Sequence, residues 1–319
     1  MDKKASQNKW KRVWLALIWL GLFAGFATSL TAILFPHSFF GDTLGNFRLQ
    51  YCFGFFVLVL LGAQSRSLLF ALLSVVGLAL NTAVLLPYYP RAEVTEDKSG
   101  LKIMSANIYR LNTEYAEFEK IVRAEEPEIL VVVEFDLLWA RALRGLEEIY
   151  PYRLQVPRDN NFGLGIYSKH ELSESVTEPL QPGQPPTIST QVKIGSDHIT
   201  LVATHPVPPR GEAGFELRNA QLQSLAERVR ESDREVLLMG DMNTTPWSAY
   251  FQRFLSESGL VNSRLGAGTV VTWPSYFPLL HIPIDYCMGT AKLKIGGLRS
   301  VLIPGSDHRG VIGHLSFRH

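Results

Sequence analysis

Apolar residues are distributed very differently in the two parts of this 319-residue chain. Three apolar runs fill the N-terminal part, at residues 13–35, 49–65 and 68–89, and only three residues between the first and last of them are charged. The first and third runs have the roughly 20 residues that a helix needs to cross a bilayer, and the middle run is shorter. Because no polar face remains for water, these runs predict a membrane anchor of three transmembrane helices at residues 1–90, not a buried hairpin of a soluble protein.

The charges around the runs predict an orientation. Five basic residues precede the first run: Lys3, Lys4, Lys9, Lys11 and Arg12. Positive residues are retained on the cytoplasmic side of a membrane. With three spans, we therefore expect an integral protein of a bacterial inner or plasma membrane whose C-terminal domain is extracytoplasmic. If the middle run only re-enters the membrane, the orientation reverses.

The remainder of the chain has the pattern of a folded domain at residues 101–319, after a polar linker at residues 91–100. Short runs rich in Val and Ile predict buried strands, and amphipathic patterns at residues 113–124 and 214–230 predict helices. The stretch "TISTQVKI", followed by "GSDHITLVAT", predicts an antiparallel hairpin. Parallel-type units mixed with hairpins predict an α/β domain in which helices cover the sheets.

Charge and cysteine content exclude some functions. Of 31 Lys/Arg and 30 Asp/Glu, residues 1–90 hold seven and two, which leaves 24 and 28 in residues 91–319, a net charge of −4. The basic footprint of a tight nucleic-acid binder is therefore absent from that part, although a nuclease is not excluded. Cys52 and Cys287 are the two cysteines, too few for a cysteine-based zinc site.

Several predicted strands are followed by polar residues. Asn107 follows "KIMSA", Glu134 follows three valines, and Asp241 and Asn243 follow "EVLLMG". Each has a simple alternative explanation as a turn or strand-edge residue, and Thr245 with Pro246 resembles a helix start. Three valines before Glu134 imply burial, however, and a buried carboxylate needs a partner or a metal. Ligand sites of open α/β proteins lie at this edge of the sheet.

Together the polar residues describe a chemistry. Glu134 and Asp241 are hard oxygen donors that suit Mg²⁺ or Mn²⁺. His205 and His308 can act as acid and base near neutral pH, and Asp285 can fix the tautomer of a histidine. Hydrolysis of a phosphate ester requires this set, because a metal offsets phosphoryl charge while a base activates water.

In their order along the chain, the motifs resemble the endonuclease/exonuclease/phosphatase superfamily, which has the DNase-I-like fold. They are "SANIY", "VVVEFD", "ATHPV", "GDMN", "IDY" and "SDH", and the similarity covers nearly all of residues 101–318. The resemblance implies an α/β fold of four layers, with two packed mixed β-sheets flanked by helices. The preceding anchor adds three transmembrane helices.

The resemblance also implies a role for each residue. Glu134 would hold the divalent ion with help from Asn107 and Asp307, and His308, paired with Asp285, would be the general base or its equivalent. Three further residues would act on the phosphate: Asp241 and Asn243 by binding it or orienting the nucleophile, and His205 by contacting it or protonating the leaving group. Asn161, in "NNFGLGIYS", would also reach the phosphate.

Two positions depart from the family pattern. Tyr109 stands where repair nucleases of the superfamily have an acidic residue, so a second carboxylate ligand is missing there. His205 stands where those enzymes have tyrosine, which makes the site more similar to the secreted nuclease and lipid-phosphodiesterase branches. No partner carboxylate for His205 is evident from the sequence.

The sequence favours a membrane-anchored, metal-dependent phosphodiesterase, nuclease or phosphatase. Its expected partners are a lipid bilayer and a phosphate-ester substrate, either nucleic acid or phosphorylated lipid, and no protein partner can be inferred. The apolar segment 272–283 either packs in the core, the favoured interpretation, or forms a lip that grips a lipid or a base. The alternative function is a non-catalytic membrane sensor or scaffold that retains the fold.

Overall fold

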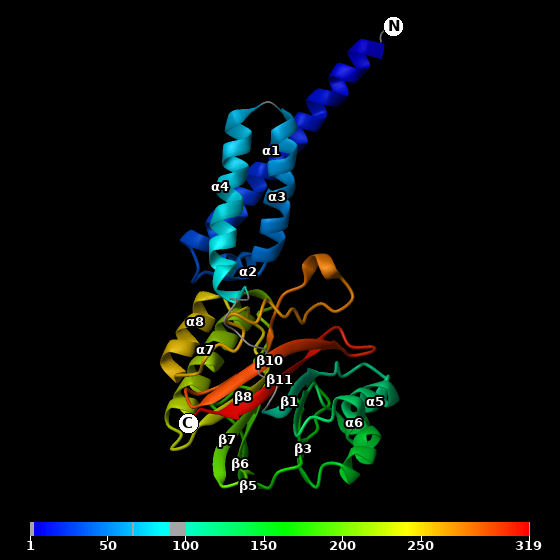
Figure 1. Ribbon diagram of the computed structural model, residues 1–319, viewed down its shortest axis with the longest axis vertical. Helices are drawn as coiled ribbons and strands as arrows, with labels where there is room; N and C mark the ends of the chain where they lie inside the picture. The colour runs from blue at the N-terminus through cyan, green and yellow to red at the C-terminus, as the bar shows by residue number, and fades with distance from the viewer. Residues whose placement is uncertain (1–2, 66, 90–99, 319) are drawn as a thin grey trace. The chain divides into compact units, whose positions relative to one another are not determined.

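The computed structural model describes residues 3–65, 67–89 and 100–318 (Figure 1). It contains two compact units: Met1–Pro87 with Trp247–Ala249, here the N-terminal unit, and Tyr88–Pro246 with Tyr250–His319, here the C-terminal unit. The predicted linker at residues 91–100 lies outside the described residues except for Gly100.

The described residues form α-helices, short 3-10 helices and strands. The helices are α1 (Lys3–Leu34), α2 (Phe39–Gly45), α3 (Arg48–Ser65), α4 (Leu68–Leu85), η1 (Leu86–Tyr88), α5 (Tyr115–Glu125), α6 (Leu137–Ala142), η2 (Leu143–Glu148), α7 (Gly211–Arg230), α8 (Ala249–Ser258) and η3 (Pro278–Leu280). The strands are β1 (Leu101–Asn107), β2 (Ile129–Val133), β3 (Tyr152–Val156), β4 (Leu164–Ser168), β5 (Leu172–Pro179), β6 (Pro186–Ile194), β7 (Asp197–Thr204), β8 (Val236–Asp241), β9 (Asp285–Gly289), β10 (Leu293–Leu302) and β11 (Arg309–Phe317).

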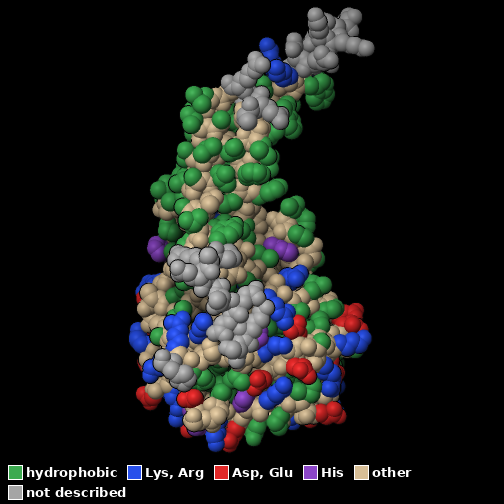
Figure 2. Space-filling view, in the orientation of Figure 1, with side chains coloured by type: hydrophobic (Ala, Val, Ile, Leu, Met, Phe, Trp, Pro, Cys, Tyr) green, Lys and Arg blue, Asp and Glu red, His purple; other side chains and the backbone are tan. Residues whose placement is uncertain are grey.

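The N-terminal unit contains two helical segments that are long and apolar enough to cross a membrane, Lys9–Leu34 and Leu68–Tyr88. The predicted middle span does not qualify by itself. Helix α3 passes only together with α2, from which it is bent by 65°. Large apolar side chains cover the outside of these helices, as the green surface in Figure 2 shows. Such a surface suits contact with lipid chains.

The C-terminal unit contains two mixed β-sheets. One has six strands in the order β10-β11-β1-β2-β4-β3, and the other has five in the order β5-β6-β7-β8-β9. Each sheet holds one parallel pair of neighbours, β1 with β2 and β7 with β8. The predicted hairpin is confirmed as β6 and β7, which pair antiparallel around a turn where Gly195 has a φ of 62°.

Three apolar cores separate four layers. One core lies between the sheets and includes Ile103, Val131, Leu201 and Met239. A second joins the six-stranded sheet to α5 and α6, and a third joins the five-stranded sheet to α7 and α8. The predicted arrangement of two packed sheets flanked by helices is therefore confirmed.

Some local predictions were wrong. The helix predicted at residues 113–124 begins at Tyr115, with Glu114 as its N-cap residue, and Asn112 Oδ1 accepts the Glu114 N–H at 2.9 Å. No helix starts at Pro246; α8 begins at Ala249.

The apolar segment before Asp285 is not a strand either. Strand β9 begins at Asp285, since the Thr272 hydroxyl accepts the N–H groups of Ile284 at 3.0 Å and Asp285 at 3.3 Å. Those two N–H groups are therefore bonded to a side chain at the start of the strand.

Candidate active site

The predicted site residues converge at one end of the two sheets. Asn107 and Asp241 are the last residues of β1 and β8, and Glu134 follows β2 directly. Asp285 begins β9 and pairs with Asp241 in register. His308 precedes β11, which runs antiparallel to β1. Strand direction thus explains how residues separated by two hundred positions meet.

The backbone at this end adopts conformations that few residues tolerate. Glu134 and Asn243 have φ values of 62° and 49°, in the left-handed region. Such backbone strain is concentrated at functional sites. Gly163, the first of the two glycines in "NNFGLGIYS", allows a close approach, because a Cβ there would lie 1.7 Å from the Phe135 carbonyl oxygen.

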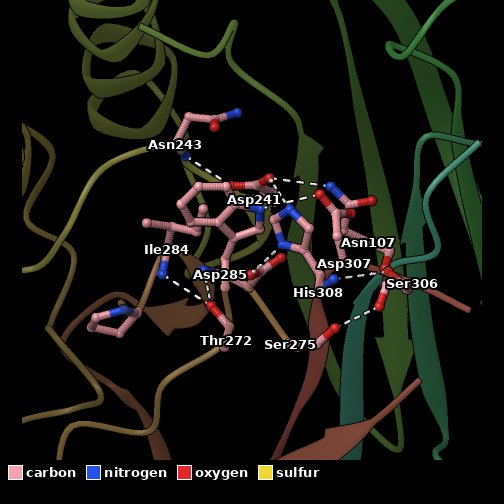
Figure 3. Close-up of polar contacts among 12 residues, drawn as sticks. Asn107, Asp241, Asn243, Thr272, Ser275, Ile284, Asp285, Ser306, Asp307 and His308 are labelled. Carbon is pink, nitrogen blue, oxygen red and sulfur yellow. Dashed lines mark hydrogen bonds and ion pairs between the residues drawn. The ribbon is translucent and has the colours of Figure 1, made fainter. Parts of the chain in front are cut away.

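Asp241 lies at the centre of the site. Its Oδ2 accepts a hydrogen bond from Asn107 Nδ2 at 3.2 Å and lies 3.5 Å from His205 Nε2 and 3.7 Å from His308 Nε2 (Figure 3). Oδ1 accepts the backbone N–H of Asn243 at 2.9 Å. The side chain is only 1% exposed. Burial by itself would raise the pKa of Asp241, but the two histidines lower it, so the carboxylate is ionised at neutral pH.

His308 forms the predicted pair with Asp285. Its Nδ1 lies 2.9 Å from Asp285 Oδ2, and both side chains are buried. Burial by itself would lower the pKa of His308, yet the charges of Asp285 and Asp241 raise it to about 10. The imidazole is therefore positively charged at neutral pH.

The carboxylate partner of His205 is Asp241, which the sequence did not reveal. Its Nδ1 lies 2.9 Å from the Asn161 carbonyl oxygen, which orients the ring. Although burial opposes it, the interaction with Asp241 raises the pKa of His205. We call His205, Asp241, Asp285 and His308 the histidine group.

Glu134, Asn107 and Asp307 form the second part of the site, here called the carboxylate–amide group. Asn107 Nδ2 donates to Glu134 Oε1 at 3.3 Å, and its Oδ1 accepts the Tyr109 N–H at 3.0 Å. Asp307 Oδ2 accepts the Trp273 indole N–H at 3.1 Å. Asp307 Oδ1 is buried and has no hydrogen-bond partner within the described residues. Oxygen donors of this kind, one of them unsatisfied, fit a hard divalent cation.

One group of carboxylate and histidine atoms among the described residues has the spacing of a metal site. Ligand atoms of Asp241, Asp285 and His308 lie within 4.8 Å of one another. A histidine must be neutral to bind a metal, however, and His308 holds its proton against Asp285. The electrostatics therefore favour the carboxylate–amide group for the ion.

The side-chain amides of Asn243 and Asn161 have different partners. Asn243 donates from Nδ2 to the Pro206 carbonyl at 2.9 Å and contacts Asp241 through its backbone N–H. Asn161 Oδ1 accepts from Arg110 Nε at 3.3 Å. Asn161 thus lies beside a cation, whereas Asn243 shapes the turn after β8.

Three arginines that contact site residues were not predicted from the sequence. Arg110 is half-buried, and its backbone N–H donates to Glu134 Oε2 at 3.2 Å. Arg218 and Arg264 are fully buried; they donate to the carbonyl oxygens of Asn243, at 2.9 Å, and Asp285. No local pattern distinguishes them from surface arginines, because their partners are backbone atoms distant in sequence.

Comparison with known proteins agrees with this geometry. The family model described as "Endonuclease/Exonuclease/phosphatase family" matches residues 104–308. No curated protein matches the chain.

Solved structures share the fold. The chain is similar to D. rerio TDP2 complexed with single strand DNA product, at 18% identity and a TM-score of 0.59, over 68% of this chain and 99% of that one. It is also similar to the human Nocturnin catalytic domain with bound sulfate anion, at 19% identity and a TM-score of 0.56, over 70% and 97%. An endonuclease/exonuclease/phosphatase from Beutenbergia cavernae matches at 20% identity and a TM-score of 0.55, over 68% and 71%.

Proposed function

Because the chain belongs to the endonuclease/exonuclease/phosphatase family, we propose that it is a divalent-metal-dependent phosphoester hydrolase in which water attacks phosphorus in line. The observation that carries this proposal is the environment of Asp241 Oδ2. Side chains from both sheets, Asn107, His205 and His308, approach that one oxygen. A buried carboxylate between two histidines is arranged to orient a water next to a bound phosphate.

Glu134 and Asp307, with Asn107 beside them, would hold the metal. When bound, Mg²⁺ or Mn²⁺ offsets negative charge on the phosphoryl oxygens and the leaving group. The unsatisfied Asp307 Oδ1 supports this assignment. Asn107 bridges the carboxylates of Glu134 and Asp241 by donating one hydrogen bond to each.

The histidine group would move and stabilise charge. Asp241, which is ionised, orients the attacking water and accepts its proton. His308 is charged, and therefore we assign it as a hydrogen-bond donor to a phosphoryl oxygen, not as the general base that the family resemblance implies. His205, whose pKa Asp241 raises against the effect of burial, donates a proton to the leaving oxygen. Arg110 and Asn161 bind the phosphate from the other side.

The experiment that tests this function uses the full chain purified in detergent. Hydrolysis of bis(p-nitrophenyl) phosphate is measured with Mg²⁺, with Mn²⁺ and with chelator. We expect turnover that requires the metal and is lost in Asp241→Asn while thermal unfolding remains cooperative. Turnover unaffected by this substitution, or no turnover, would favour the non-catalytic sensor or scaffold.

We further propose that the protein is anchored in a bacterial inner or plasma membrane by three spans, with the C-terminal unit, from here on called the catalytic unit, outside the cytoplasm. The two qualifying helices support anchoring, and the α2–α3 pair is the candidate third span. A reporter fused after His319 tests the orientation. Activity of a periplasm-specific reporter is expected; activity of a cytoplasm-specific reporter would contradict it.

A further inference from the structure

The catalytic unit exposes an apolar loop next to the proposed site. Between Trp273 and Pro283 the chain carries Tyr276, Phe277, Leu279 and Leu280, whose exposed fractions are 74%, 44%, 64% and 40%. The loop, orange in Figure 1, projects beyond β10 and β11. The favoured prediction that this segment packs in the core was therefore wrong for its central residues, although Ile282 is buried. Exposed apolar patches of this kind mark interaction surfaces.

The loop is bonded to the proposed metal site. Ser275 donates from its backbone N–H to the Asp307 carbonyl at 2.7 Å and from Oγ to the Ser306 carbonyl at 2.6 Å (Figure 3). Trp273 donates to the Asp307 carboxylate. The exposed side chains of the loop therefore begin one residue after a segment fixed to Asp307.

Exposed leucines also follow the other proposed metal ligand. Leu137 and Leu138, at 59% and 56% exposure, open α6 just after Glu134. Leu111, at 62%, follows Arg110, whose N–H donates to Glu134. Apolar side chains thus adjoin both Glu134 and Asp307. We call the seven residues the apolar rim: Leu111, Leu137, Leu138, Tyr276, Phe277, Leu279 and Leu280.

Charge argues against a nucleic-acid strand as the occupant of this rim. Segment 273–283 contains no Lys, Arg, Asp or Glu, and residues 91–319 carry a net charge of −4. Grooves that follow a nucleic-acid backbone are basic. Exposed apolar side chains on segments bonded to a proposed phosphate site instead complement a molecule with a phosphate and hydrocarbon chains.

The chain enters the catalytic unit directly from an apolar span. Tyr88 is the last residue of the span Leu68–Tyr88 and belongs to the catalytic unit. Its carbonyl accepts the Gly268 N–H at 2.7 Å, and its hydroxyl donates to the Pro246 carbonyl at 2.9 Å. The end of the span is therefore bonded to the chain five residues before Trp273. When this span crosses a bilayer, the chain connects the catalytic unit directly to that bilayer.

We propose that the apolar rim enters the bilayer interface and that the substrate is a phosphoester carried by a membrane lipid. This inference rests on the proposed function and specifies its substrate class. The rim side chains contact acyl chains next to the headgroup, while Arg110 and the site residues receive its phosphate.

The first test compares a lipid with a soluble substrate. The full chain is reconstituted into phosphatidylcholine vesicles containing phosphatidylglycerol, and phosphate-ester cleavage of both lipids is measured beside that of bis(p-nitrophenyl) phosphate and a single-stranded oligonucleotide. In Tyr276→Ser/Leu279→Ser we expect a loss of about tenfold or more on lipid, because two exposed apolar side chains no longer enter the interface. The rate on the soluble diester stays within about twofold, since neither residue contacts the site. The matched control Tyr152→Ser/Val176→Ser alters exposed apolar residues of β3 and β5 and leaves both rates unchanged.

A second test measures insertion without catalysis. Leu279→Cys is labelled with a polarity-sensitive dye in an inactive Asp241→Asn chain whose Cys52 and Cys287 are replaced by Ala. A blue-shifted emission is expected in vesicles, whereas the same dye at Val176→Cys keeps its aqueous spectrum. An aqueous spectrum at both positions would overturn the inference.

The outcomes separate this inference from the proposed function. Asp241-dependent cleavage of the oligonucleotide and the soluble diester, without lipid cleavage, overturns the lipid substrate and leaves the hydrolase. Lipid cleavage that the rim substitutions do not change overturns the role of the rim. If no substrate is cleaved in a reaction that depends on Asp241, the proposed function and this inference are both contradicted.

Discussion

The histidine group and the carboxylate–amide group satisfy their charges in different ways. In the histidine group each buried charge faces an opposite one: Asp285 pairs with His308, and Asp241 lies between His205 and His308. In the carboxylate–amide group, neutral groups donate the hydrogen bonds to Glu134 and Asp307. One buried Asp307 oxygen has no hydrogen-bond partner among the described residues. Asp285 Oδ1 in the first group also has no partner among the described residues, but His308 supplies positive charge there, whereas the second group contains no cationic side chain. The two groups therefore predict different responses to substitution, metal and pH.

Asp241→Asn should have the largest effect because Asp241 connects both groups. The amide keeps the acceptor for the Asn243 N–H but removes the charge between the two histidines. We expect kcat/KM to fall on the order of 10³-fold. Steady-state kinetics on bis(p-nitrophenyl) phosphate measure it, and a loss below about tenfold would contradict the central place of Asp241.

Glu134→Gln should act through the metal. Loss of this carboxylate is expected to reduce activity about 100-fold and to raise the Mg²⁺ concentration needed for half-maximal rate. Glu178→Gln, an exposed carboxylate on β5, is the matched control. An unchanged Mg²⁺ requirement in Glu134→Gln would assign the ion to Asp241, Asp285 and His308 instead.

The pH dependence of stability should identify the histidine group. The folded-state pKa of His308 is about 10, above the unfolded value of about 6.5, so its contribution is complete below about pH 6.5 and is lost as pH rises toward 10. With chelator present, wild type should exceed His308→Gln by on the order of 2 kcal/mol in free energy of unfolding at pH 6. Denaturant titrations across this range measure it. A difference that grows with pH would refute the charged state of His308.

Trp273→Phe should have the smallest effect. It removes the indole hydrogen bond to Asp307 and keeps an aromatic ring, so we expect a loss of about threefold in activity. Trp139→Phe serves as the control because Trp139 is buried in the core beside Phe118. It should lower the melting temperature without a specific loss of turnover.

The sequence was sufficient to predict most of the fold because buried strands have a strong local signature. Runs such as "ILVVV" identified strand positions, and strand direction then brought Asn107, Glu134 and Asp241 to one edge. Helix starts were less predictable. The helix predicted from residue 113 begins at Tyr115, and its N-cap residue Glu114 makes no side-chain cap hydrogen bond, so no cap signal in the sequence marked the start.

Contacts between distant segments were the part that the sequence could not provide. The carboxylate partner of His205 comes from β8, and the supports of Arg264 are backbone carbonyls. The exposure of Tyr276 and Leu279 likewise depends on how a loop folds, because the same apolar composition is typical of a core.

The most direct test of a single shared site is a double-mutant cycle between Glu134→Gln and Asp241→Asn. Activity of the wild type, both single variants and the double variant is measured at saturating Mg²⁺. If the two carboxylates act on one phosphorus centre, the double variant should be nearly as active as Asp241→Asn, because the first loss already removes the shared step. Losses that multiply fully would show that the two carboxylates act independently and would contradict the account.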